Sequence, residues 1–406
     1  MKHANIAGKI RQIAFLGNHL PRQCGIATFT TDLSSAMAAE FSSTDCFVVA
    51  MNDPSKQYAY PPRVRFEVAE SDIASYRRAA DFLNSHKIDI VSVQHEYGIF
   101  GGKAGSYLLA LLRNLRMPIV TTVHTMLGKP DSMQRRAMNE IARLSTRLVV
   151  MSAQGATLLH NVHGVAKDKI DIIPHGIPSV PVAGGNKKEL GLDGKSMLFT
   201  FGLLSPDKGI EHVIDALPEI LTRKPNTVYV VLGATHPHLK ERYGESYRES
   251  LARRAQELGV ESSVIFDNRF VRSSELVRFL AAADVYITPY LKMEQSTSGT
   301  LAYAVGSGKA IISTPYLYAR ELLADGRGII VPPRDPQAIA RTVIDLLSDD
   351  AKRLALCERA AMYGRSMVWS AVARRYQRSF DRACSREKSR PRVSQGLEIR
   401  ARRFPT

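Results

Sequence analysis

The chain has 406 residues, of which 45% are apolar and 23% charged. This excludes a mainly disordered protein and is enough for two or three domains with their own cores. The net charge of +16 predicts an anionic partner, such as a phosphorylated ligand, an acidic membrane surface or nucleic acid. The sequence has no run of about 18 apolar residues, no signal-like start and no closely spaced cysteine pair. We therefore expect a cytoplasmic protein without a disulfide framework.

Short β-branched runs alternate with longer helical patterns in the first half of the chain. Continuous apolar strands joined by helices are typical of a parallel sheet that is covered on both faces. The alternation therefore predicts a doubly wound fold. The predicted strands are residues 13–16, 46–50, 88–93, 119–123, 148–151 and 170–173, and the predicted helices are 30–40, 73–85, 104–115 and 132–144.

A polar segment with glycine and proline, residues 178–195, separates this half from a second one and is interpreted as an interdomain linker. The alternation then restarts, which predicts a second α/β domain. A last helix is expected over 367–384, followed by a basic tail, 385–406, that we expect to be largely disordered. The predicted strands of the second half are 198–201, 228–232, 264–266, 285–288, 311–313 and 329–331.

Polar residues gather where the strands of the first half end, which is where doubly wound sheets bind ligands. A glycine-bearing turn after the first strand contains Arg22 and Gly25 and opens a helix, so its amides can approach an anion or a sugar hydroxyl. A histidine at a strand end can bind a sugar or move a proton, but it is more often structural. The other candidates here are His95, Glu96, Tyr97, His124, Ser152 and the turn at His175, which can also be simple turn chemistry.

Two segments of the second half have a composition suited to phosphate. The first contains Gly202, Ser205 and Lys208 between a strand and a helix, where an ammonium and free amides can together neutralise a diphosphate. The second places hydroxyls and a glycine ahead of an alanine-rich helix, which suits phosphate or sugar oxygens and equally an N-cap. Its candidates are Glu294, Gln295, Ser298, Gly299 and Thr300. We predict no metal site, and His236-Pro237-His238 is interpreted as a surface loop.

The order of these segments resembles the retaining nucleotide-sugar glycosyltransferases of the GT-B fold, family 4. The resemblance spans about residues 10–384 and rests on PRQCGIATF, TVHT, IPHGI, FGLLSPDKGIEHVIDAL, AAADVYITPY, GSGKAIISTP, Glu321, GIIVPP and SMVWSAVARRY. It implies two Rossmann-like domains that face a cleft. The acceptor-side domain would span residues 1–180, the nucleotide-sugar-binding domain 181–365, and a helix over 366–384 would cross back to the first domain.

The sequence departs from the family pattern at three positions. The arginine usually found five places before the lysine is Leu203, and the paired glutamates of the family fall on Gln295 and Tyr303. An amide and a phenol can still bind sugar hydroxyls, but neither supplies a carboxylate. The chain is therefore expected to be either a variant subgroup or an enzyme of weakened activity.

The resemblance implies transfer of a hexosyl group from a nucleotide diphosphate sugar to an acceptor hydroxyl of a glycan, glycolipid or small molecule, with retention. It implies no cofactor beyond the donor and no metal. Lys208 and the amides near Ser298 and Thr300 would hold the diphosphate, with Gln295 and His124 positioning the sugar. The donor-side set is Gly25, Gly202, Ser205, Lys208, Glu294, Gln295, Ser298, Gly299, Thr300 and Tyr303, and the acceptor-side set is Arg22, His95, Glu96 and Tyr97.

Three alternatives stay open at this point. The same two-sheet plan serves nucleotide-sugar epimerases and phosphorylases. The lost arginine and glutamates also fit a protein that binds a sugar nucleotide without turning it over. Nucleic-acid binding is suggested by charge alone, and we expect instead that the basic surplus serves an anionic membrane surface that carries the acceptor.

Overall fold

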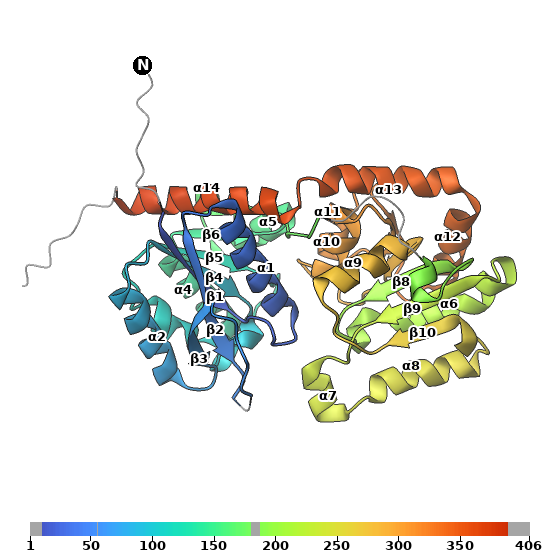
Figure 1. The fold of residues 1–406 in the computed structure, drawn as a ribbon, viewed down its shortest axis with the longest axis horizontal. Helices are drawn as coiled ribbons and strands as arrows, with labels where there is room; N and C mark the ends of the chain where they lie inside the picture. Colours follow the sequence, from blue (N-terminus) through green and yellow to red (C-terminus); the bar gives the residue numbers. More distant parts are fainter. Residues whose placement is uncertain (1–9, 55, 180–186, 389–406) are drawn as a thin grey trace, which may run out of the picture.

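The computed structural model describes residues 10–54, 56–179 and 187–388. They form two lobes, each built on one parallel sheet with helices packed on both faces (Figure 1). We call the part that contains strands β1 to β7 the first lobe and the part that contains β8 to β13 the second lobe. The two doubly wound sheets confirm the predicted fold class.

The first lobe is a seven-stranded sheet in the order β3-β2-β1-β4-β5-β6-β7. Strand β1 lies at its centre and pairs with β2 and β4, with Ile13 opposite both Cys46 and Ile90. The strands are β1 (Gln12–Gly17), β2 (Asp45–Asn52), β3 (Val64–Ala69), β4 (Ile90–His95), β5 (Ile119–Val123), β6 (Arg147–Val150) and β7 (Ile170–Ile172). The helices are α1 (Gly25–Glu40), α2 (Ile73–Ser85), α3 (Leu108–Leu112), α4 (Ser132–Leu144) and α5 (Ala153–His163).

Two features of this lobe differ from the sequence prediction. Strand β3 was not expected, because its charged residues Arg65 and Glu67 alternate with half-buried ones, as in an edge strand with one solvated face. The helix expected over 104–115 is shortened to α3, because Ala104 takes a left-handed conformation with φ of 53°. Alanine rarely adopts that region, so a continuous helix through it was the natural expectation.

The second lobe is a six-stranded sheet in the order β10-β9-β8-β11-β12-β13, and each of its strands overlaps a predicted one. The strands are β8 (Ser196–Phe201), β9 (Thr227–Leu232), β10 (Val264–Asp267), β11 (Val285–Thr288), β12 (Ala310–Ser313) and β13 (Ile329–Ile330). The helices are α6 (Ile210–Arg223), α7 (Pro237–Tyr243), α8 (Ser246–Glu257), α9 (Ser273–Ala282), α10 (Gly299–Gly306), α11 (Leu317–Leu322), α12 (Pro336–Ser348) and α13 (Asp350–Gly364).

The chain passes between the lobes twice, and the two crossings lie side by side. Ile177 N donates to Met367 O at 2.9 Å, and Trp369 N donates back to Ile177 O at 3.0 Å. Beyond this point α14 (Trp369–Lys388) leaves the second lobe and packs along α1 of the first, as the red helix over the blue lobe shows (Figure 1). The hydroxyls of Tyr376 and Thr122 lie 2.9 Å apart and fasten this helix to β5.

Direct hydrogen bonds also join the lobes on the side of α5. Met126 N donates to Ser296 Oγ at 2.9 Å, and Glu321 accepts from Ala153 N at 2.7 Å and Gln154 N at 3.0 Å, which caps α5 from the other lobe. Within the described ranges, no helix is long and apolar enough to cross a bilayer. Helix α14 runs four residues past its predicted end, and the rest of the predicted tail lies outside the described residues, as do residues 180–186 of the linker.

Candidate active site

A cavity of about 940 Å³ lies between the lobes, at the carboxyl ends of strands β8 to β11. This is the edge at which open α/β sheets bind ligands. The first lobe contributes Leu20, Pro21, Gln23, Gly25, Thr28 and Phe29 to its wall. His175, which lies between β7 and the linker, also lines the cavity. The second lobe contributes Phe201, Gly202, Leu203, Ser205, Asp207, Lys208, Leu232, Gly233, His236, residues 269–274, Leu276, Lys292, Gln295, Gly299, Thr300 and Tyr303.

Lys208 lines this cavity at the end of a short 3-10 helix, Pro206–Lys208, that follows β8. Its Nζ lies 3.9 Å from the centroid of the Tyr290 ring, so the aromatic face orients the ammonium. Gly209 follows with φ of 63°, and a Cβ there would lie 2.3 Å from Pro289 O, so only glycine fits this turn. In the part of the chain that the structure describes, Lys208 makes no ion pair. Its charge is therefore available to an anion.

The amino end of α10 reaches the same cavity through Gly299 and Thr300. Ser298 is the N-cap, and its Oγ accepts from Leu301 N at 3.3 Å. Thr300 Oγ1 lies 2.7 Å from Tyr290 OH, so the helix start and the ring beneath Lys208 are joined directly. Free amides and the helix dipole favour negative charge here. Lys208 and the α10 amides thus lie on one wall of the cavity, where their charge and dipoles suit an anion.

The two positions at which the sequence lacks glutamate both face this cavity. Gln295 donates from its amide nitrogen to Thr297 O at 3.0 Å, which orients the amide. Tyr303 is 5% exposed and donates its hydroxyl to Asp32 Oδ2 of α1 at 3.2 Å. Glu294, by contrast, is exposed and does not line the cavity. Ser298 is buried, and besides capping α10 its Oγ lies 3.0 Å from Thr300 Oγ1.

His124 lies behind the wall and not on it. Its Nε2 is 3.1 Å from Gln94 Oε1, and the Gln94 amide nitrogen donates to Ser92 Oγ at 3.1 Å, so Nε2 of His124 carries the proton. Burial, with smaller contributions from His175 and His95, lowers the pKa of His124 to about 3. The imidazole is therefore neutral at physiological pH.

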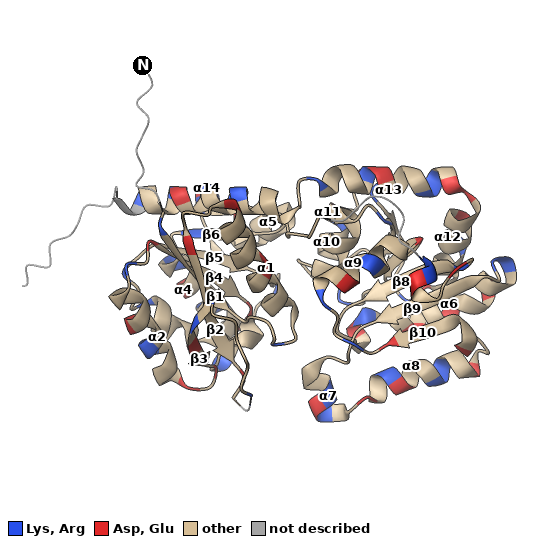
Figure 2. Cartoon of the chain, viewed as in Figure 1, with Lys and Arg blue, Asp and Glu red and all other residues tan. Residues whose placement is uncertain are grey.

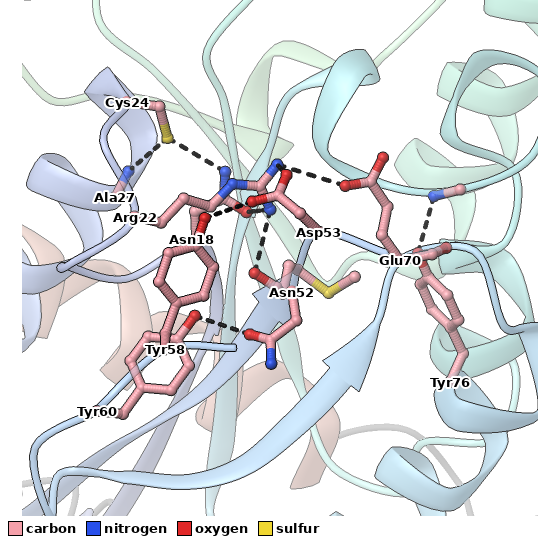
Figure 3. Close-up of polar contacts among 12 residues, drawn as sticks. Asn18, Arg22, Cys24, Ala27, Asn52, Asp53, Tyr58, Tyr60, Glu70 and Tyr76 are labelled. Carbon is pink, nitrogen blue, oxygen red and sulfur yellow. Dashed lines mark hydrogen bonds and ion pairs between the residues drawn. The ribbon is translucent and has the colours of Figure 1, made fainter. Parts of the chain in front are cut away.

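The acceptor-side arginine is neutralised inside the first lobe (Figure 3). Arg22 is 8% exposed, and its guanidinium lies 2.7 Å from Asp53 and 3.3 Å from Glu70. It also donates to Asn18 Oδ1 at 3.0 Å and Met51 O at 3.1 Å. Figure 3 shows this group pointing toward the two carboxylates, which follow β2 and β3. Its role is to hold the loops at the carboxyl ends of β1, β2 and β3 together.

The other three acceptor-side residues also point into the first lobe. His95 is fully buried between the rings of Tyr97 and Phe100, and no described residue forms a hydrogen bond with either of its ring nitrogens. Glu96 accepts from Tyr97 N at 2.9 Å and from the hydroxyl of Thr125, and burial raises its pKa. None of the three lines the cavity.

Sequence reasoning overlooked several cavity residues. Arg269 and Arg272 follow β10, where the strand-end rule would have pointed to them, and Lys292 follows β11. Arg269 pairs with Asp267 at 2.6 Å and Glu275 at 2.8 Å. All four lysines and arginines of the wall belong to the second lobe, and Asp207 is the single carboxylate among the described residues that line it. Across the described ranges, no three histidines, cysteines or acids form a metal-binding group.

Two facing α/β lobes with a cavity between them at the strand ends make up the GT-B fold. The family model described as Glycosyltransferase Family 4 matches residues 24–179, and the one described as Glycosyl transferases group 1 matches 185–366. The chain belongs to these glycosyltransferases, as its segment order predicted.

Curated relatives span nearly the whole chain. A D-inositol 3-phosphate glycosyltransferase of Frankia alni is 26% identical in an alignment of length 400 that covers 89% of this chain and 95% of that protein. The phosphatidyl-myo-inositol mannosyltransferase of Mycolicibacterium smegmatis is 25% identical over 317 residues, 76% of this chain and 75% of that protein.

Solved structures share the fold at lower identity. The sucrose-phosphate synthase of Thermosynechococcus elongatus superposes with a TM-score of 0.74 at 16% identity and covers 93% of this chain and 100% of that one. Anabaena HepE in complex with UDP and glucose superposes with a TM-score of 0.70 at 16% identity, covering 91% and 99%. At this identity the likeness concerns the fold.

Proposed function

We propose that the protein transfers a hexosyl group from a nucleoside diphosphate sugar to an acceptor hydroxyl, with retention of anomeric configuration and without a metal. The observation that carries this proposal is the pairing of Lys208 with the amino end of α10 around Tyr290. A cation and oriented amides stabilise charge as it develops on a leaving diphosphate. The HepE structures, solved with UDP and with UDP-glucose, share this fold and support the same donor class.

In the proposed reaction the bond from the anomeric carbon to the diphosphate oxygen breaks, and a bond to the acceptor oxygen forms. The acceptor proton passes to the leaving diphosphate. An inverting displacement would need a general base on the acceptor side. The first-lobe part of the described wall has no ionisable side chain, being made of Leu20, Pro21, Gln23, Gly25, Thr28 and Phe29. This supports retention, in which the diphosphate itself takes the proton.

The charge distribution also bears on the acceptor. The cations of the wall lie on the second lobe, and Arg22 of the first lobe is already paired with two carboxylates. We therefore propose an acceptor that presents uncharged hydroxyls to the first lobe. The inositol phosphate and phosphatidylinositol named for the relatives would enter with their phosphate directed elsewhere.

A panel of UDP-, GDP- and ADP-sugars tests the donor site by thermal shift and then by hydrolysis and transfer. Lys208→Met should lose about 2 to 4 kcal/mol of transition-state stabilisation, which is roughly 30- to 1000-fold in turnover. Lys240→Met on α7 is the matched control, because Lys240 is 63% exposed and pairs only with Glu245. Near-normal turnover of the Lys208 variant would contradict the assignment. Release of sugar 1-phosphate would favour a phosphorylase, and binding without turnover would favour a sugar-nucleotide-binding protein.

We further propose weak peripheral association with anionic membranes. Lys, Arg, Asp and Glu are interspersed over both lobes (Figure 2), yet the whole chain carries +16. Each Lys or Arg near an anionic lipid surface contributes about 1 kcal/mol to membrane binding, and salt screens this attraction. The protein should sediment with vesicles that contain phosphatidylserine at low ionic strength and be released at high ionic strength. Absence of sedimentation at low salt would refute this.

A further inference from the structure

His175 lies between β7 and the interdomain linker. It lines the cavity and is 8% exposed. Its ring packs edge-on against Phe29 of α1, with centroids 5.1 Å apart, and also against Tyr303 of α10 and Trp369 of α14, at 6.1 and 6.2 Å. Rings from three separate helices therefore hold this imidazole in one orientation.

The hydrogen bond at one ring nitrogen determines the tautomer. Nδ1 of His175 lies 2.7 Å from the carbonyl oxygen of Gly176. A carbonyl only accepts, so Nδ1 must carry the proton and Nε2 must hold a lone pair. Among the described residues, none donates a hydrogen bond to Nε2. Burial lowers the pKa of His175 to about 4, so the ring is neutral at physiological pH.

The position of Nε2 indicates which group it faces. It lies 3.0 Å from the point where a Cβ on Gly299 would stand, so it abuts the first residue of α10. The amides at that end are the ones that we assign to the diphosphate. The lone pair on Nε2 repels a phosphate oxygen. A hydroxyl group, by contrast, can donate a hydrogen bond to that lone pair. The hydroxyls next to a bound diphosphate are those of the sugar that it carries.

We propose that His175 Nε2 accepts a hydrogen bond from a hydroxyl of the donor's hexosyl group and thereby positions the sugar beside the α10 amino end. This rests on the proposed function. The neutral imidazole supplies a hydrogen-bond acceptor in this wall. The two positions where the family pattern has glutamate are occupied here by Gln295 and Tyr303. Specificity follows, because the site selects donors with a hydroxyl at one ring position over donors with hydrogen or fluorine there.

The experiment compares the affinity for a nucleoside diphosphate with that for its sugar conjugate. The probes are UDP with UDP-glucose, GDP with GDP-mannose and ADP with ADP-glucose, measured by calorimetry on wild type, His175→Phe and His175→Gln. His175→Phe should leave the diphosphate affinity unchanged and weaken the sugar conjugate roughly tenfold, the effect of one lost hydrogen bond. His175→Gln, which keeps an acceptor oxygen, should restore most of the loss. His86→Phe, an exposed residue at the end of α2, is the control for the substitution itself.

A series of monodeoxy donors then identifies the hydroxyl. One deoxy donor should bind wild type roughly tenfold more weakly than the parent sugar and bind His175→Phe with no further loss. The proposal would be overturned if His175→Phe lost affinity equally for all sugar donors and for the bare diphosphate. It would also be overturned if diphosphate binding took up a proton in wild type but not in His175→Phe. Either result would leave the proposed transferase intact if wild type still turns over. A wild type that neither binds nor turns over any of the sugar conjugates would instead overturn both.

Discussion

Tyr303 of α10 donates its hydroxyl to Asp32 of α1 and so ties the second lobe to the first across the floor of the cavity. This phenol stands where the related enzymes are expected to have a glutamate, and the carboxylate comes from the opposite lobe. Burial raises the pKa of Asp32 to about 6, and the hydrogen bond from Tyr303 opposes this with a smaller lowering effect. The contact is therefore coupled to protonation.

The first prediction concerns the pH dependence of stability. The pKa of Asp32 is higher in the folded chain than in the unfolded one, so the folded state binds more protons between pH 4 and 6 and loses stability as the pH rises through that window. A shift of this size corresponds to about 2 to 3 kcal/mol. Asp32→Asn should remove this loss.

Urea denaturation at pH 4.5, 5.5 and 7 measures this pH dependence of the unfolding free energy. Wild type should lose about 2 kcal/mol more than Asp32→Asn across the series. Asp81→Asn on α2 is the control, because Asp81 is exposed and lies far from the interface in the fold. Parallel curves for wild type and Asp32→Asn would refute the role of this carboxyl.

The second prediction concerns the attachment of α14. Asp171 of β7 accepts from Arg147 at 2.6 and 2.8 Å and from Ser379 of α14 at 2.6 Å. Burial alone would raise the pKa of Asp171, but the bonds from Arg147 and Ser379 hold it below its usual value. Asp171→Asn leaves Arg147 buried without a counter-charge and should cost about 3 to 5 kcal/mol of unfolding free energy.

Its matched control is Asp168→Asn, which removes the exposed pair with Arg386 of the same helix. An exposed pair contributes about 0 to 1 kcal/mol, so this variant should stay near wild type. Hydrogen exchange of the α14 amides should accelerate only in Asp171→Asn. The stabilisation by Asp171 should also decrease once the pH falls below 3.8, the usual pKa of the group, and be lost as the pH passes the lower pKa of the folded state, where the carboxylate becomes protonated. Equal stability of the two variants would contradict the prediction.

The third prediction concerns the ring beneath Lys208. Tyr290→Phe keeps the aromatic face at 3.9 Å from the ammonium, whereas Tyr290→Leu removes it. A desolvated cation–π contact contributes about 1 to 2 kcal/mol. Calorimetry with UDP, GDP or ADP should therefore show roughly five- to thirtyfold weaker binding for the leucine variant and a smaller change for phenylalanine. Indistinguishable affinities of the two variants would show that the ring does not orient Lys208.

The fourth prediction concerns the packing of α13 on α10. A Cβ on Gly364 would lie 2.7 Å from Gly306 Cα and 2.9 Å from Gly306 O, which are backbone atoms and cannot move aside cheaply. Gly364→Ala should cost about 1 to 3 kcal/mol in denaturant unfolding. Gly98→Ala adds a Cβ in open space and should change stability by less than about 0.5 kcal/mol. A neutral Gly364→Ala would mean that the helices separate without penalty.

Most strands were predictable because continuous apolar runs joined by helices form a buried parallel sheet in either lobe. The six strands expected in the second lobe are all present, whereas the edge strand β3 escaped prediction because two of its six residues, Arg65 and Glu67, are charged. Lys208, Gln295 and Gly299 were predictable as well, since loops at the carboxyl ends of parallel strands converge on one cavity.

Arg22, His95 and Glu96 show where such prediction stops. They follow strands just as Lys208 does, yet their side chains turn inward. The carboxylates that hold Arg22 come from Asp53 and Glu70, distant in sequence and brought near only by the pairing of β1, β2 and β3. His175 was visible only as part of a turn, because its role depends on rings from α1, α10 and α14.

The amino-acid order alone thus determined the two sheets, the family and the anion-binding loops, because local periodicity and strand-end position require no knowledge of partners. Tertiary structure decided which polar side chains face the cavity, which are neutralised, and which rings surround the His175 imidazole. Those properties depend on groups that lie tens or hundreds of residues apart, and an ion pair or a desolvated imidazole exists only once folding has brought them together.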